Sequence, residues 1–407
     1  MSSRGRSIAC RCLQRLWRND MNTKKNRAML YLSVLSVFAF CNCLGAIDGA
    51  LSKIAEALNV DHTVALYAGS FPALTSVFSS LLLGVVAGKK LRYKNTAIVC
   101  AALMIVAGVI PFLAKSFSMI LLARCFFGLG LGGMMSMQNP IATKLIPEEK
   151  RAVILGLGTC TSFTFQCILQ LVGGILADVR WNLVFFTHLI LLIPFLVLIF
   201  FLPKIELDPP EARQTEKAKL PAAAILMCVV IGIATLILAP LLFGSAFYVA
   251  ALSDSATVAS VIAMLFSIGC MVGGLLYSKL YGWLKRKSFT VFLLIGAVGL
   301  VLSAAARTIP LLGLGFFIGG ISFSSMQAGL MMLLGLICPP ERLGFASALM
   351  IVFVNVGAFL CTNWEMLVSR ITGDALYAPL RIGAAIFVLL AILLLLKSPF
   401  PKDDGQA

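Results

Sequence analysis

Residues 202–220 read Leu-Pro-Lys-Ile-Glu-Leu-Asp-Pro-Pro-Glu-Ala-Arg-Gln-Thr-Glu-Lys-Ala-Lys-Leu, and this stretch divides the chain into two long apolar blocks. Four acidic and four basic side chains lie within it, so the core of a bilayer would exclude it. Pro203 ends the apolar segment before it, and Pro209-Pro210 favours an extended backbone. The pattern predicts a linker, residues 203–220, between two comparable blocks.

The composition indicates that both blocks lie in lipid. Of the 407 residues, 60% are hydrophobic and only 12% are charged, whereas soluble domains carry roughly 25% charged residues. Too few polar side chains are present to cover a water-soluble core of this size. Most of the twelve cysteines fall inside apolar runs, which is typical of small buried side chains rather than of a disulfide framework or a metal site. We therefore expect an all-α membrane protein.

Twelve apolar runs are long enough to span a bilayer, which takes about 20 residues. Their ranges are 28–47, 64–86, 96–114, 119–145, 153–176, 183–202, 221–242, 257–276, 289–306, 309–336, 343–363 and 380–396. We expect five parts: a basic N-terminal segment (1–27), an N-terminal six-helix bundle (28–202), the linker (203–220), a C-terminal six-helix bundle (221–397) and a tail (398–407).

The basic residues predict the orientation of these spans. With the N-terminus inside, 26 of the 33 Lys and Arg residues fall in inside segments and six in outside segments, while Arg124 alone lies within a span. The positive-inside rule then predicts a multi-pass protein of the cytoplasmic membrane with both termini and the linker in the cytoplasm. The same asymmetry accounts for the net charge of +16 without nucleic acid as a partner.

The basic N-terminal segment allows two interpretations. Its eight bases and the apolar residues spaced helically over 9–17 are typical of an amphipathic helix on an anionic membrane surface. The alternative is that translation begins at Met21, so that the residues before it are not part of the protein.

The two blocks repeat the same features in the same order. The second and eighth runs each end in a glycine, three further residues, a small residue and a basic turn. The fourth and tenth runs each contain a Phe-Phe pair, several glycines, a Ser-Met-Gln tripeptide and a closing Pro-Glu turn. The matching residues are Gly84, Gly88, Lys89 and Arg92 with Gly274, Ser278 and Lys279, then Phe126-Phe127 and Ser136-Met137-Gln138 with Phe316-Phe317 and Ser325-Met326-Gln327. Offsets of 189 to 193 residues indicate two copies of a six-helix unit.

These motifs resemble those of the major facilitator superfamily over residues 28–397, and within it those of bacterial multidrug and sugar-efflux permeases. The resemblance implies twelve transmembrane helices in two pseudo-symmetric six-helix bundles that work by alternating access. It assigns gating roles to the basic glycine motifs, at Gly84, Gly88, Lys89, Arg92, Gly274 and Lys279. Gly88 and Ser278 stand where the family commonly has an aspartate, so this gate departs from the usual pattern. Pro240 and Gly244 interrupt the seventh run and predict a bend or free carbonyls there.

Arg124 is the most informative polar residue within a span, because a charge in lipid is costly without a partner. It resembles the arginine of the family's fourth helix, which implies proton coupling or binding of an anionic group. The alternative is a side chain that extends to the outer headgroups. The fifth run places a polar stripe on one helix face, formed by Thr159, Ser162, Gln166, Gln170 and Gly173. We expect this stripe to line the cavity or to bond neighbouring helices.

The remaining candidates are fewer and weaker. Asp48, which follows Asn42 and Gly45, is interpreted either as a titrating group of the outer vestibule or as a solvated loop residue. Glu365 is expected in the outer loop, and His188 as a satisfied polar residue. Gln138 and Gln327 are expected to face the central path from opposite halves, or to bond neighbours within their own halves. Ser325, which is alternatively a packing residue, and Asn355 complete the set.

No sequence motif indicates an enzyme, since no phosphate-binding loop, metal set or nucleophile–base pair is found. We expect a secondary active transporter of a small organic solute, coupled to H⁺, embedded as a monomer in the lipid bilayer and without a cofactor. Within that class, export of amphipathic compounds and uptake of a small organic anion near Arg124 are both left open. The alternative from another class is a non-transporting receptor or scaffold on the same fold.

Overall fold

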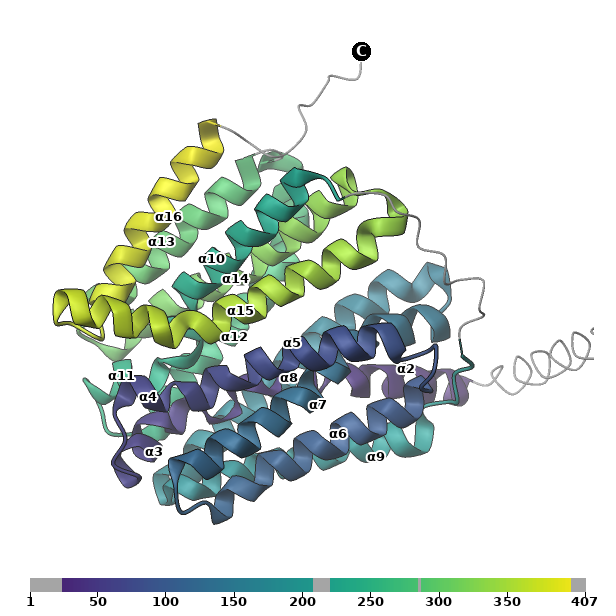
Figure 1. Cartoon of the computed structure of the whole chain (residues 1–407), viewed down its shortest axis with the longest axis horizontal. Helices are drawn as coiled ribbons and strands as arrows, with labels where there is room; N and C mark the ends of the chain where they lie inside the picture. The colour runs from purple at the N-terminus through teal and green to yellow at the C-terminus, as the bar shows by residue number, and fades with distance from the viewer. Residues whose placement is uncertain (1–23, 208–219, 285–286, 397–407) are drawn as a thin grey trace, which may run out of the picture.

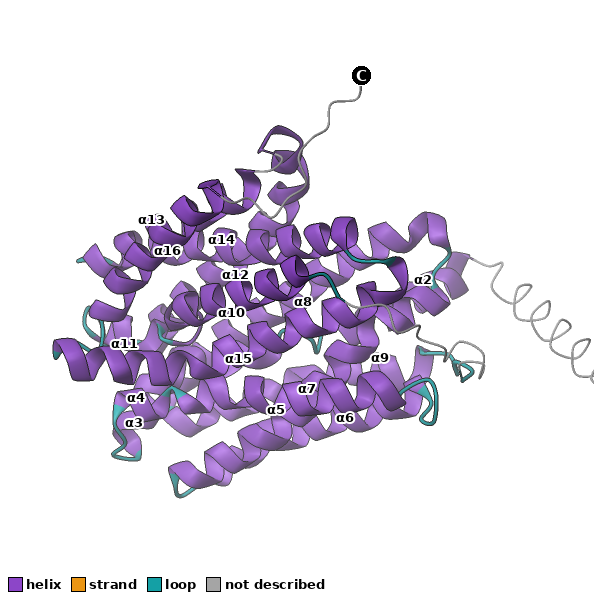
Figure 2. Cartoon of the chain, turned by 45° about the horizontal axis from the view of Figure 1, so that its top comes forward, coloured by secondary structure: helices purple, strands orange, loops and turns teal. Residues whose placement is uncertain are grey.

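The computed structural model describes residues 24–207, 220–284 and 287–396, and over these ranges the chain is almost entirely helical (Figure 2). The elements before and after the linker form two groups of long helices that lie against each other (Figure 1). The basic N-terminal segment up to residue 23, residues 208–219 of the linker and the tail lie outside the described residues, so the expectations for them stay predictions.

The helices follow the apolar runs closely, because about 20 apolar residues are both the length and the composition that a bilayer requires. In chain order the elements are α2 (Lys24–Phe38), η1 (Cys43–Ala50), α3 (Leu51–Ala57), α4 (His62–Ala65), α5 (Tyr67–Val86), α6 (Tyr93–Val109), η2 (Ile110–Leu113), α7 (Phe117–Leu145), α8 (Glu148–Val179), η3 (Trp181–Leu191), α9 (Leu192–Phe201), α10 (Ala222–Phe243), α11 (Ser245–Ala250), α12 (Ala256–Leu284), α13 (Ser288–Ala305), α14 (Ile309–Ile337), α15 (Pro340–Thr372) and α16 (Ala378–Leu396). In the described residues, eleven helices are long and apolar enough to cross a membrane, and the number is twelve when one bent pair of helices is counted as a single span. The predicted fold class is confirmed.

The same helix pairs pack in both halves, as the repeat predicts. In the first half α5 and α6 pack on α7, and η1 packs on α8; in the second half α12 and α13 pack on α14, and α10 packs on α15. The two largest interfaces between the halves are α5 with α15 and α8 with α12, and the repeat relates one to the other; η1 of the first half also packs on α12. We call the end of the molecule with α3, α4 and α11 the distal end, at the left of Figure 1, and the end where α9 stops and α10 starts the linker end.

Glycines allow the central helices of each half to touch. A Cβ on Gly132 of α7 would collide with the Ser76 carbonyl of α5, and one on Gly320 of α14 would collide with the Phe266 carbonyl of α12. Small residues permit such close approach of helices in lipid, where apolar burial alone does not drive association. The glycines of the fourth and tenth runs therefore serve helix packing.

The first span is broken and extends beyond its predicted end. The chain bends by 51° between Ala28–Phe38 and Cys43–Ala57, with residues 39–42 forming the break. Asn42 lies in this break, half-buried and without a capping hydrogen bond from its side chain. Asp48 consequently belongs to the second half of the span, so the interpretation as a loop residue is wrong.

The backbone conformation explains the glycine in the predicted gating motif that follows the second span. Gly88 adopts φ +80°, and a Cβ there would collide with the ring of Tyr93. This turn therefore requires glycine at the position where the family commonly has an aspartate. Gly84, Lys89 and Arg92 lie around it and are all exposed. In the second half, Gly274 packs near Ser324 and Lys279 is exposed.

The seventh span contains the predicted interruption. Pro240 lies inside α10, Gly244 separates α10 from α11, and the Gly244 amide donates to the Pro240 carbonyl at 2.8 Å. The helix is therefore interrupted at Gly244, as predicted, but the Pro240 carbonyl is not free.

Candidate functional site

Arg124 is completely buried within the N-terminal half. Its Nε donates to the Ala68 carbonyl at 2.7 Å and one terminal nitrogen to the Leu44 carbonyl at 2.8 Å. Its guanidinium also lies over the Phe127 ring, 4.8 Å from the centroid. The other terminal nitrogen has no partner among the described residues. A side chain held in this way does not reach the headgroups, so the alternative of extension to the surface is wrong.

Asp48 lies close enough to Arg124 for the two charges to interact, but the carboxylate makes no hydrogen bond within the described residues. A Cβ on Gly45 would meet the Asp48 carboxylate together with the amide nitrogens of Gln166 and Gln170, at 3.1 and 3.0 Å. The acid and both glutamines of the predicted stripe therefore converge on Gly45. All are buried, with Asp48 0% exposed. A glycine at 45 leaves the space into which these polar groups point.

The polar cluster continues across the boundary between the halves. The Ser267 hydroxyl of α12 donates to the Gln170 side-chain carbonyl of α8 at 3.1 Å. Close to it, Gly49 and Gly174 both pack against Ser260 of α12. The cluster thus lies where the two halves meet.

His188 contacts the same Phe127 ring as Arg124. Its ring stacks edge-on against Phe127 at 5.2 Å between centroids, and Nδ1 is 3.1 Å from the Phe185 carbonyl. Nε2 has no partner in the part of the chain that the structure describes. The expected satisfied histidine is therefore only half satisfied.

Glu365 corrects another expectation. It lies within α15, inside the span Phe345–Thr372, and is only 4% exposed, so its placement in the outer loop is wrong. Tyr248 of α11 and Cys361 of α15 lie close enough to interact with it electrostatically, and Cys361 is also near Asp48. The apolar run ended at 363 in sequence because Asn363, Glu365 and Arg370 interrupt it; the helix continues because α15 packs on α5 and α10.

The two halves are bonded to each other in the distal part of the molecule. The Tyr67 hydroxyl of α5 donates to the Asn363 side-chain carbonyl of α15 at 2.6 Å, and the Ser70 and Thr362 hydroxyls are 3.3 Å apart. The rings of Tyr67 and Phe71 both pack on Phe359. These bonds close the α5–α15 interface.

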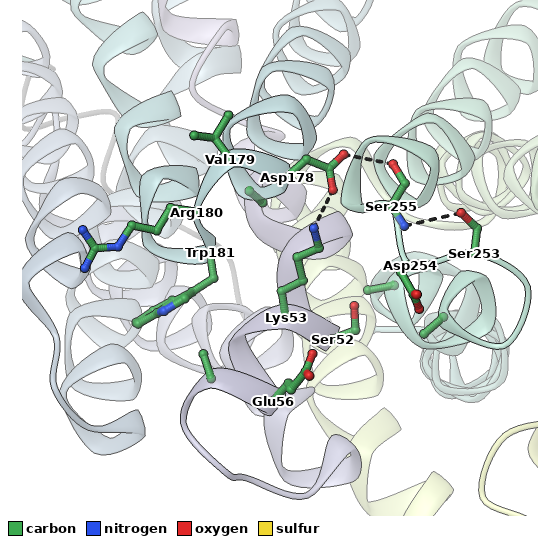
Figure 3. A pocket seen from close by; sticks show the side chains of 14 residues that line it. Ser52, Lys53, Glu56, Asp178, Val179, Arg180, Trp181, Ser253, Asp254 and Ser255 are labelled. Carbon is green, nitrogen blue, oxygen red and sulfur yellow. Dashed lines mark hydrogen bonds and ion pairs between the residues drawn. The ribbon is translucent and has the colours of Figure 1, made fainter.

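Asp178, which no sequence motif singled out, closes the α8–α12 interface. At the end of α8 its carboxylate accepts hydrogen bonds from the Ala256 and Thr257 amides at 2.8 and 2.9 Å, the first amides of α12, and from the Ser255 hydroxyl at 2.9 Å. Lys53 pairs with the same carboxylate at 2.6 Å (Figure 3). An anion suits a helix N-terminus, where backbone amides lack partners within the helix. The pair lines an open pocket of about 660 Å³ at the distal surface.

The other candidates have different surroundings. Ser162 donates to the Phe38 carbonyl at 2.7 Å and so links α8 to the broken first span. Ser325 is fully buried and donates to the Gly273 carbonyl of α12 at 3.0 Å, which supports its role in helix packing; a role toward the solute stays a prediction. Asn355 is buried in α15, and its amide nitrogen has no partner in the described part of the chain.

Gln138 of α7 and Gln327 of α14 are both half-buried. No extended interface joins α7 to α14 over the residues that the structure describes. Gln138 and Gln327 are therefore not part of an extended interface between the halves in this conformation, and their gating role stays a prediction.

The site consists of buried charges and amides at the junction of two helical halves that are bonded at one end, which is the arrangement of a carrier for small molecules. The family model described as Major Facilitator Superfamily matches residues 33–362. The chain belongs to this family, whose members are non-enzymatic carriers, and it is a secondary transporter.

Solved structures share this fold. A D-xylose-proton symporter superposes with a TM-score of 0.72 at 16% identity, covering 92% of this chain and 98% of that one. A mutant of the nucleoside transporter NupG gives 0.72 at 18% identity, covering 90% and 99%. A bacterial homologue of the human lysosomal transporter Spinster, in an inward-facing and occupied conformation, gives 0.69 at 16% identity, covering 91% and 96%.

A relative in sequence is the MFS efflux transporter inpD of Emericella nidulans. It is 34% identical over 95 residues, which are 23% of this chain and 18% of that protein. The chain therefore matches less than a fifth of the length of this relative.

Proposed function

We propose that this chain couples proton movement to transport of a small organic solute, with Asp48 and Arg124 as the coupling pair. The supporting observation is that an acidic and a basic side chain are completely buried near each other and yet keep unbonded atoms among the described residues, both Asp48 oxygens and one Arg124 nitrogen. When the Asp48 carboxylate gains a proton, or when Arg124 moves away from it, the charge of the cluster next to Gln166 and Gln170 changes. Charged groups are retained inside membranes mainly where they carry out such functions.

We further propose that the linker end faces the cytoplasm of the cell and that the described conformation is closed to the outside. The asymmetry of basic residues supports the orientation. The bonds of Asp178, Tyr67 and Ser70 across the two halves support closure of the distal end. The protein would act as a monomer, because each chain contains both halves of the carrier.

Three observations bear on the alternatives. Asp48 near Arg124 argues against a simple site for organic anions, because its carboxyl group already occupies space close to the guanidinium. A scaffold would not need Gln166 and Gln170 buried at the junction between the halves. Export is suggested only by the name of a relative that matches over 95 residues.

The test uses the purified protein in liposomes that contain a pH-sensitive dye. A thermal-shift screen of sugars, nucleosides, carboxylates and amphipathic amines first identifies a solute, and its addition should then acidify or alkalise the lumen. Arg124→Ala should abolish this proton flux, and Arg124→Lys should restore only part of it, because a point charge replaces a planar group that forms two hydrogen bonds. Asp48→Asn should uncouple solute movement from proton movement.

Arg307→Ala is the matched control, because Arg307 is exposed at the distal end. It should leave the flux unchanged. Wild-type proton flux in Arg124→Ala, in protein that inserts normally, would contradict the assignment of the coupling pair.

A further inference from the structure

A second buried acid, in the C-terminal half, is not part of the Asp48–Arg124 pair. Glu365 lies about 10 Å from the distal end of α15, given a rise of about 1.5 Å per residue. It is 4% exposed, and in the described residues it accepts no hydrogen bond and faces no cation. An ionised carboxylate without either kind of partner is costly in a dry interior.

The titratable groups around Glu365 do not compensate a negative charge. Tyr248 approaches it from α11 and Cys361 from its own helix. Asp374 and Tyr377, from the connection to α16, lie near Tyr248, and Asp48 of the other half lies near Cys361. All of these are neutral or acidic groups. The surroundings therefore accommodate the neutral carboxylic acid and disfavour the carboxylate.

The helix that carries Glu365 is also the helix that closes the distal end. Thr362 and Asn363 of α15 bond to α5, and Phe359 packs on the same helix. Separation of α5 from α15 would break these contacts and admit water to the residues next to Glu365. Water stabilises a carboxylate, so the charge of this acid and the opening of the distal end are linked.

We propose that Glu365 is a proton-binding residue of the C-terminal half, and that its carboxylate must take up one proton from the distal side before the distal end closes. This inference deepens the proposed function and rests on it. When the distal end is open, the carboxylate accepts a proton from water; when α5 and α15 close, the neutral acid becomes buried; reopening returns the proton to water. Asp48 has a cation, Arg124, near it, whereas Glu365 has none among the described residues, so a proton is the group that can neutralise it.

A proton fits this position better than the cationic group of a solute. Glu365, Tyr248 and Cys361 are all buried, at 4%, 2% and 0% exposed, and the distal pocket is not lined by any of them. A proton needs no cavity, whereas an amine would. Binding of a solute amine is therefore the outcome that would replace this proposal.

The experiment measures opening of the distal end directly. Ser70 is 0% exposed in the closed interface, so the thiol of Ser70→Cys should react with an impermeant maleimide only when this end opens. Ser116→Cys, exposed at the same end, provides the reference for reagent chemistry at each pH. Mass spectrometry of the two peptides distinguishes these thiols from the native cysteines. Labelling at position 116 from outside intact cells also tests the proposed orientation.

In the wild-type background, the ratio of labelling at position 70 to that at position 116 should rise with pH, by up to about tenfold per pH unit, the limit for one linked proton. Glu365→Gln, which mimics the neutral acid, should keep the ratio low at every pH. Glu365→Asp should retain the pH dependence. Glu56→Gln, an exposed acid at the same end, is the matched control and should behave as wild type.

An unchanged pH dependence in Glu365→Gln would overturn the proposal, and so would a high ratio at every pH. Unchanged pH dependence combined with lost binding of an amphipathic amine would assign Glu365 to the solute instead. If Ser70→Cys does not fold, hydrogen exchange of the amides at 67–71 in the native cysteine background gives the same comparison. This experiment measures opening of the distal end and not proton flux. The proposal for Glu365 can therefore fail while the Arg124-dependent flux is confirmed, and the flux can fail while the pH dependence of opening through Glu365 is confirmed.

Discussion

At the scale of single residues, Asp178 joins the halves through several bonds at once. One carboxylate holds Lys53 of its own half and the first amides of α12 in the other half. Its side chain is 30% exposed, so water and salt weaken the ion pair, but the hydrogen bonds from the helix amides are short and directed. The geometry exists only while α8 and α12 are in contact.

Removal of this carboxylate should therefore favour the open distal end. We expect Asp178→Ala to raise the labelling of Ser70→Cys about 5- to 30-fold, the range for a loss of roughly 1–2 kcal/mol. Asp254→Ala provides the control, because Asp254 lines the same pocket and is exposed. Equal labelling in the two variants would mean that Asp178 does not hold the gate.

At the scale of elements, the glycines of α7 and α14 determine how closely each half packs. Gly320 lies against the Phe266 carbonyl, so even a methyl group has to displace α12. Gly335, further along α14, is exposed and has nothing within 4 Å of the position that a methyl group would take. Two glycines of one helix thus differ completely in what a side chain would meet.

Gly320→Ala should lower stability by about 1–3 kcal/mol through overpacking, seen as a lower Tm in detergent. Gly335→Ala should leave stability unchanged or raise it by up to about 1 kcal/mol, since alanine favours a helix over glycine. The difference between the two Tm values is the quantity to measure. Equal Tm values would show that α12 and α14 can separate at Gly320 without loss.

At the scale of the whole molecule, the α5–α15 and α8–α12 interfaces are closed distally, while no extended interface joins α7 to α14 over the described residues. Gln138 and Gln327 occupy equivalent positions of the two repeats on these helices. If the halves rock about the central cluster, opening of the distal end should bring the linker-side parts of α7 and α14 together.

Spin labels at positions 138 and 327 should accordingly give a shorter mean distance when the distal end is opened by Asp178→Ala or by high pH. A pair of labels within one half, at Ser136 and Thr159, serves as the control, and the distance between these labels should not change. Position 320 is not used for a label, because a side chain there would disturb packing. A distance between 138 and 327 that is the same under all conditions would contradict the gating role.

The sequence alone determined the membrane class, the twelve spans, the repeat and the family, because apolar length and repeated motifs are properties of contiguous residues. It also selected Arg124, Gln166 and Gln170, since a polar group within an apolar run stands out without any structure. The tertiary structure decided the partners: Asp48 and Glu365 proved buried, Ser325 donates to a carbonyl of α12, and Asp178 forms hydrogen bonds between the halves. Burial and pairing depend on residues far apart in the chain, such as Asp178 with Thr257 or Tyr67 with Asn363, and only the packed helices bring these together.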